Sequence, residues 1–156
     1  MNITIFQAAV FLFYVGFLLY RFRKPLPSIS DSWYELEEPT RWLFTLFCWS
    51  LGGAMLFQGT EETPLFFLSG TGLMFVGAAT QFKWSGAHTN LVHYGGALVG
   101  IMAALCGLGV EYGNWIPLIL WIIGVLLLKV TKIKNFTWWV EILAFISIIS
   151  GFLLRN

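Results

Sequence analysis

Long apolar runs alternate with short polar segments along the whole chain. A helix needs about 20 mostly apolar residues to cross a membrane, because the hydrocarbon core is about 30 Å thick and each residue advances a helix by about 1.5 Å. Six runs have this character, and the segments between them are too short to form separate domains. The pattern predicts one all-α transmembrane domain, a helical bundle over residues 1–156. Its helices are expected at about 3–20, 41–57, 64–82, 91–110, 115–128 and 136–154.

The only long polar stretch lies between the first two predicted helices. It runs from Ser28 to Glu38 and holds four of the eight acidic residues. Pro25 and Pro27 end the preceding helix, because proline lacks a backbone N–H and clashes with the previous turn. Ser30 or Asp31 is suited to capping a short turn at the membrane surface. We therefore expect polar chemistry in this protein to involve the Ser28–Glu38 stretch.

The composition supports an integral membrane protein. The chain is 58% hydrophobic and 11% charged, whereas soluble domains carry about 25% charged residues. A chain with so little charge cannot cover a surface that faces water. The net charge of +1 argues against a nucleic-acid partner. Cys48 and Cys106 lie inside apolar segments, which favours buried free thiols over a disulfide.

The distribution of positive charge predicts how the chain is threaded through the membrane. The first, third and fifth connections, at 21–41, 83–90 and 129–135, hold eight of the nine Lys and Arg residues. Connections rich in Lys and Arg stay in the cytoplasm. These three connections are thus expected to be cytoplasmic, and both termini are expected outside.

Glu141 is a candidate functional residue because it lies about one turn inside the last predicted helix. A carboxylate within a membrane helix is costly and points to function by default. The alternative is a structural carboxylate near the interface, paired with Lys132, Lys134 or Arg41. A pairing with His93 is also open, because both residues lie near the cytoplasmic ends of their helices.

The two histidines, His88 and His93, are five residues apart. On a helix this spacing corresponds to about 140° of rotation, so the two side chains do not share a face. They could converge only if His88 precedes the helix. A zinc site would then need a third ligand such as Asp31 or Glu141. The alternative is an interfacial histidine hydrogen-bonded to a loop.

Three short motifs resemble a known pattern: Ile29-Ser30-Asp31, Gly72-Leu73-Met74-Phe75-Val76-Gly77, and His93 at the start of a glycine-rich helix. Together they resemble an uncharacterised bacterial family of six-helix membrane proteins with an Ile-Ser-Glu-Leu-Gly loop. The resemblance implies a helical bundle with a polar pocket where Ser30 and Asp31 meet His93. Asp31 stands where that family usually has Glu.

More distantly, the chain is similar to the superfamily of alkaline ceramidases and progestin/adiponectin receptors. Those proteins are seven-helix zinc amidases that use three histidines, a serine and an aspartate. This chain departs from that pattern, since it has two histidines and no HxxxH motif.

The first functional hypothesis is a small protein of the bacterial inner (plasma) membrane that binds a lipid, an amphiphile or a membrane partner at its cytoplasmic face. The expected partners are membrane lipids, with a homo-oligomer left open, and no cofactor is expected. A second hypothesis is a metal-dependent lipid amide or ester hydrolase, with zinc on His88, His93 and Asp31. A third is a small oligomeric transporter or channel. Enzymatic activity is left open, and a non-enzymatic function is favoured. The expected ligand-binding residues are Ser30, Asp31, His88, His93 and Glu141.

Overall fold

The computed structural model describes residues 2–59, 63–79 and 87–154, and for 87–90 it describes the backbone alone. Seven α-helices and one short 3-10 helix lie in these residues. The α-helices are α1 (Ile3–Phe22), α2 (Ser32–Glu35), α3 (Trp42–Gln58), α4 (Pro64–Ala79), α5 (Ala87–Tyr112), α6 (Ile116–Val130) and α7 (Phe136–Leu153), and the 3-10 helix is Glu38–Thr40. The predicted all-helical fold is confirmed, and each predicted helix overlaps one of the six longer α-helices.

Two details differ from the prediction. The polar stretch contains the short helix α2, and the 3-10 helix begins at its last residue, Glu38, where only a short turn was expected. Helix α5 begins at Ala87, four residues before the apolar run that was used to predict its start. No proline or glycine interrupts residues 87–94, so the helix continues through its polar first turn. The helix start predicted near Leu91 is therefore wrong, and His88 lies inside the helix.

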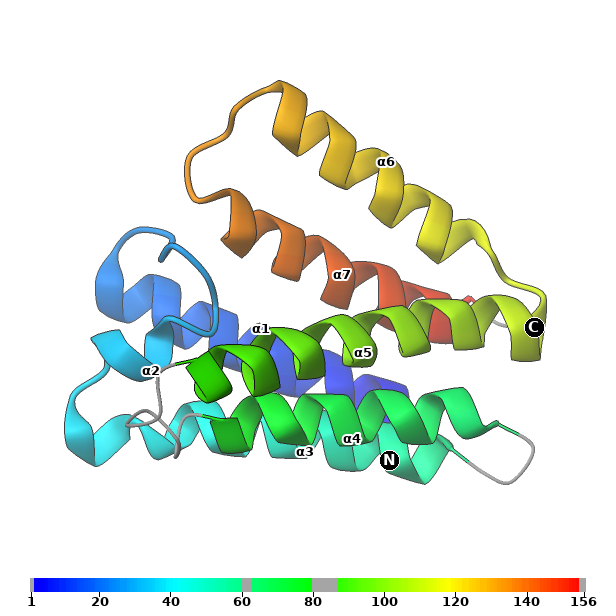
Figure 1. The fold of residues 1–156 in the computed structure, drawn as a ribbon, viewed down its shortest axis with the longest axis horizontal. Helices are drawn as coiled ribbons and strands as arrows, with labels where there is room; N and C mark the ends of the chain where they lie inside the picture. The colour runs from blue at the N-terminus through cyan, green and yellow to red at the C-terminus, as the bar shows by residue number, and fades with distance from the viewer. Residues whose placement is uncertain (1, 60–62, 80–86, 155–156) are drawn as a thin grey trace.

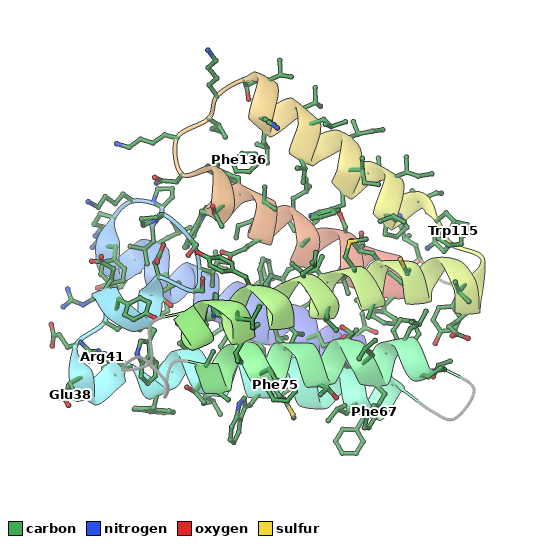
Figure 2. All side chains as sticks on the ribbon, viewed as in Figure 1. Glu38, Arg41, Phe67, Phe75, Trp115 and Phe136 are labelled. Atoms are coloured by element: carbon green, nitrogen blue, oxygen red, sulfur yellow. The ribbon has the colours of Figure 1, made fainter. Side chains whose placement is uncertain are left out.

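Among the residues that the structure describes, three helical segments are long and apolar enough to cross a membrane: Ile3–Phe22, Leu91–Tyr112 and Phe136–Leu153. Helices α4 and α6 are apolar but shorter. Large apolar side chains are exposed on the bundle, among them Phe67 and Phe75, and the ring of Phe67 projects away from the helices (Figure 2). Such a surface is compatible with a lipid environment, because lipid tails are as apolar as these side chains. The membrane prediction is confirmed at this level.

Helices α3, α4 and α5 pack closely through glycines (Figure 1). A Cβ on Gly72 of α4 would lie 2.7 Å from both the carbonyl oxygen of Gly96 and the nitrogen of Gly100 in α5. A Cβ on Gly70 would lie 2.5 Å from the carbonyl oxygen of Gly52 in α3. In lipid, small residues allow this approach of two helix backbones, and van der Waals contact then holds the helices together.

The hairpin formed by α6 and α7 meets α5 at one end and diverges from it at the other (Figure 1). At the closed end, a Cβ on Gly151 of α7 would be in contact with Leu108 of α5 and Pro117 of α6. At the open end, the segment between α1 and α3 lies between α5 and α7 (Figure 1). A cavity lies at this open end, beside the polar stretch.

Aromatic and aliphatic side chains anchor the polar stretch to the bundle. Leu26, Ile29 and Leu36 are buried in the same core cluster as residues of α1, α3 and α7. In this cluster Tyr14 of α1 stacks on Phe47 of α3, with ring centroids 4.4 Å apart. The stretch is thus part of the folded core, and its polar side chains are held in defined positions.

Candidate ligand-binding site

The start of α7 and the segment Pro25–Ile29 lie along one another in a regular register. Alternate residues of the segment are hydrogen-bonded to residues spaced three apart, from the residue before α7 into the helix. The hydrogen bonds run from Asn135 Nδ2 to the Pro25 carbonyl (2.8 Å), from the Trp138 N–H to the Pro27 carbonyl (3.0 Å), and from the Ile29 N–H to Glu141 Oε2 (2.5 Å). The Trp138 N–H is one of the first backbone donors of α7, which have no partner inside the helix. The segment therefore completes the helix start and fixes the position of Glu141.

Ser28 organises the turn that presents Ser30 and Asp31. Its Oγ accepts the Asp31 N–H at 3.0 Å and donates to Asp31 Oδ2 at 2.8 Å. The hydroxyls of Ser28 and Ser30 are 2.9 Å apart. Asp31 is the residue before α2 but makes no side-chain capping bond. The capping role predicted for Ser30 or Asp31 is thus wrong, because the reciprocal bonds of Ser28 hold the turn instead.

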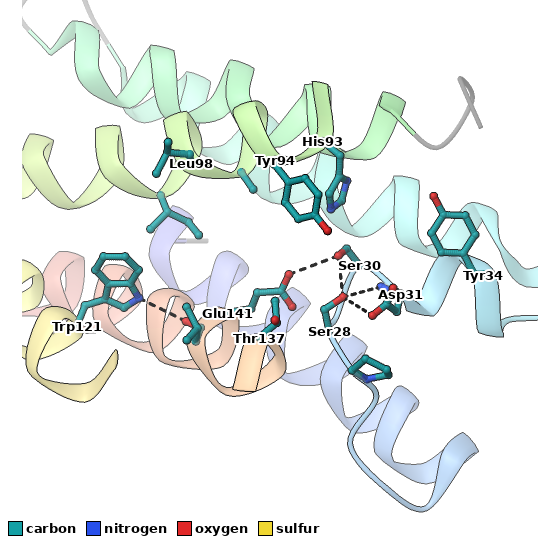
Figure 3. Close-up of a pocket in the computed structure, with 14 residues that line it drawn as sticks. Ser28, Ser30, Asp31, Tyr34, His93, Tyr94, Leu98, Trp121, Thr137 and Glu141 are labelled. Carbon is teal, nitrogen blue, oxygen red and sulfur yellow. Dashed lines mark hydrogen bonds between the residues drawn. The ribbon is translucent and has the colours of Figure 1, made fainter. Parts of the chain in front are cut away.

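Glu141 is partly buried and turned toward this turn (Figure 3). Its Oε2 accepts the Ile29 N–H, and its Oε1 has a long contact of 3.5 Å with Ser30 Oγ. In the described part of the chain the one ion pair joins Arg21 to Glu37. The alternative in which Glu141 pairs with a lysine or with Arg41 is therefore wrong there. Instead, Arg41 Nε donates to the Leu36 carbonyl.

His93 and Tyr94 face Ser30 and Glu141 from α5 (Figure 3). The two rings are in edge contact, with centroids 5.6 Å apart and an interplanar angle of 81°. His88 is in the first turn of the same helix, about 140° around the helix from His93. The side chain of His88 lies outside the described atoms, and so does Lys83.

These residues surround a cavity of about 370 Å³ between the polar stretch, α5, α6 and α7 (Figure 3). This volume is within the range of about 300–1,000 Å³ that ligand pockets occupy. The polar end is formed by Ser28, Ser30, Asp31, Thr137 and Glu141, with His93 beside it. The remaining wall is apolar or aromatic and comprises Tyr94, Ala97, Leu98, Ile101, Trp121 and Val140, with Tyr34 and Pro27 at the margins.

The apolar wall was not predicted, although part of it has a sequence signal. Tyr94, Ala97, Leu98 and Ile101 follow the i, i+3, i+4, i+7 spacing of one helix face. Trp121 had no such signal, because every face of α6 is apolar. Its indole Nε1 is 3.4 Å from the Val140 carbonyl of α7, which holds the ring against the cavity.

The described side chains do not form a metal centre on their own. Within residues 2–59, 63–79 and 91–154, no group of three or more His, Cys, Asp or Glu side chains is arranged to hold a metal ion. The zinc hypothesis requires His88, whose side chain is outside that range. His93 and Asp31 alone supply two ligands of the four that a tetrahedral zinc site uses.

No protein-family model matches the chain, and no curated protein or solved structure is detectably similar to it. The resemblances to the six-helix bacterial family and to the ceramidase superfamily stay predictions. The cavity itself is the basis for a functional proposal.

Proposed function

We propose that this chain is a multi-pass protein of the bacterial inner membrane that binds a lipid or another amphiphile at its cytoplasmic face. The observation that carries the proposal is the two-part lining of the cavity. Hydroxyls and carboxylates form one end, and apolar and aromatic side chains form the rest. A ligand that fits such a lining has a polar head and an apolar tail.

The apolar wall is accessible from the side of the bundle. Tyr94 and Leu98 line the cavity and are still 68% and 63% exposed. In a membrane this exposed surface of α5 would face lipid. An amphiphile could therefore enter laterally, with its tail remaining in hydrocarbon and its head moving toward Glu141.

The position of the basic residues supports a cytoplasmic cavity. Asn135 of the α6–α7 connection is bonded to Pro25, so this connection and the one between α1 and α3 are at the same end of the bundle. The two connections, 21–41 and 129–135, contain seven of the nine Lys and Arg residues. The positive-inside rule assigns this end to the cytoplasm.

The test is photolabelling of the purified protein in phosphatidylcholine nanodiscs with a neutral diazirine-bearing fatty alcohol. Peptide mapping should place the label on α5 and α7 beside the cavity. Ala97→Trp puts an indole into the cavity and should remove most of this labelling. Val99→Trp is the matched control, because Val99 is on the same helix, is exposed, and does not line the cavity.

Two results would contradict the proposal. One is labelling spread evenly over lipid-facing helices, with no enrichment at the cavity. The other is equal labelling of the Ala97→Trp and Val99→Trp variants, which would show that the label does not occupy the cavity.

A further inference from the structure

We propose that the head group accepted by this cavity is a protonated amine, so that the preferred ligand is a cationic amphiphile. This inference rests on the function proposed above and specifies the ligand class of the same site. Three features carry it: the charge at the polar end, the unused hydrogen-bond acceptors, and the aromatic wall.

The polar end contains two carboxylates, those of Asp31 and Glu141. Neither forms an ion pair with a Lys or Arg side chain in the parts of the chain that the structure describes. Among the described residues of the lining His93 is the one basic side chain, and a protonated imidazole could balance only one of the two charges. Charges away from water need a partner, because their desolvation is expensive. A cationic head group would supply the missing counter-charge.

The hydrogen bonds at the polar end leave acceptors available. An ionised carboxylate can accept about four hydrogen bonds. Glu141 accepts one short bond from Ile29 and one long contact from Ser30, and Asp31 accepts one from Ser28. An alkylammonium group has three N–H donors and no acceptor. It therefore matches this surplus of acceptors, whereas a phosphate would add further acceptors and more negative charge.

The wall next to the carboxylates is aromatic. Tyr94 and Trp121 both line the cavity, and their ring faces attract cations. The attraction grows when the cation is shielded from water, as it would be between α5 and α7. The same rings offer apolar surface to the first carbons of the tail. Charge, hydrogen bonding and ring chemistry thus favour the same class of head group.

The experiment compares three ligands with the same tail: dodecylamine, dodecanol and dodecyl phosphate. Each competes with the fatty-alcohol photoprobe for the protein in phosphatidylcholine nanodiscs, and each dissociation constant is measured. Dodecylamine should bind at least about tenfold more tightly than dodecyl phosphate, because one charge-assisted hydrogen bond corresponds to about 10- to 100-fold in affinity. Phosphatidylethanolamine should compete better than phosphatidylcholine, because its amine carries N–H donors.

Two variants remove charge while keeping an acceptor oxygen for the existing bonds. In Glu141→Gln the amide oxygen can still accept the Ile29 N–H, and in Asp31→Asn it can still accept from Ser28. Each should reduce dodecylamine affinity by about 10- to 100-fold and leave dodecanol affinity unchanged. Glu38→Gln is the matched control, since Glu38 is exposed and outside the cavity. Two variants are used so that a folding defect in one does not decide the result.

The outcomes separate this inference from the proposed function. If the three ligands compete equally and both variants behave like the control, the amine preference is wrong while amphiphile binding stands. Tighter binding of dodecyl phosphate would overturn the inference in the same way. If ethylamine, which has no long tail, competes as well as dodecylamine, the amphiphile proposal fails and the amine preference survives. If no ligand displaces the probe, both proposals fail.

Discussion

Replacement of Gly72 by alanine should force helices α4 and α5 apart. The new Cβ would lie 2.7 Å from the carbonyl oxygen of Gly96, 2.7 Å from the nitrogen of Gly100 and 2.9 Å from the Cα of Gly100. Ordinary van der Waals contact begins near 3.4 Å, so the backbones must separate by about 0.7 Å, the gap between that limit and the shortest of these distances. All three contacts are backbone atoms, and no side-chain rotation can relieve them.

The expected loss of stability follows from these contacts. Overpacking of this kind costs about 1–3 kcal/mol. Separation of the helices also strains the hydrogen bond from Ser69 Oγ to the Gly100 carbonyl, now 2.7 Å long, which is worth about 1 kcal/mol. The higher helix propensity of alanine offsets about 0.5–1 kcal/mol of this loss of stability. The net loss of about 1–3 kcal/mol corresponds to a fall in Tm of about 2–10 °C for a chain of this size.

The assay is thermal unfolding in detergent, followed with a thiol-reactive dye. Cys48 is buried in the folded protein and becomes accessible on unfolding. Gly95→Ala is the matched control, because a Cβ on Gly95 has no atom within 4 Å, and its Tm should stay the same or rise slightly. A Tm for Gly72→Ala equal to that of Gly95→Ala would refute the close contact between α4 and α5.

Two further predictions concern the anchoring of the polar stretch and its side of the membrane. The hydroxyls of Tyr14 and Ser32 share a buried hydrogen bond of 2.7 Å, so Tyr14→Phe and Ser32→Ala should each lower the free energy of unfolding by about 1–3 kcal/mol. The double variant should lose less than the sum, as measured by a double-mutant cycle of thermal unfolding, and strict additivity would show that the bond is absent. Glu38→Cys should react with a membrane-impermeant thiol reagent in inverted vesicles and stay unlabelled in intact cells, and labelling from outside would reverse the proposed topology.

The helices could be predicted from the sequence because an apolar run of membrane length has few alternatives to a helix. The start of α5 could not, because the polar residues of its first turn resemble a loop in hydropathy. Ser30, Asp31, His93 and Glu141 could be assigned to one end of the bundle from charge and topology. The hydrogen-bond partner of Glu141 could not be predicted, because it is the backbone N–H of Ile29. Every residue except proline has such a donor, so the sequence does not single it out.

The cavity as a whole could not be predicted from the sequence either. Its apolar wall and the lipid-facing surface use the same residue types, so hydropathy cannot distinguish Ile101, which lines the cavity, from Val99, which does not. The divergence of the α6–α7 hairpin depends on packing at the closed end, around Gly151 and Leu108. Such packing is specified by three helices together and by no single segment.

The register between Pro25–Ile29 and the start of α7 has a consequence for the biogenesis of this protein. Pro25 and its partner Asn135 are 110 residues apart in the chain. The amino-terminal segment leaves the ribosome long before its partner helix has been synthesised. Until α7 is inserted, the carbonyls of Pro25 and Pro27 and the N–H of Ile29 must be satisfied by water at the membrane surface. A chain that stops before α7 lacks Thr137 and Glu141, so the polar end of its cavity is incomplete. Ligand binding that needs Glu141 would therefore report that insertion is complete.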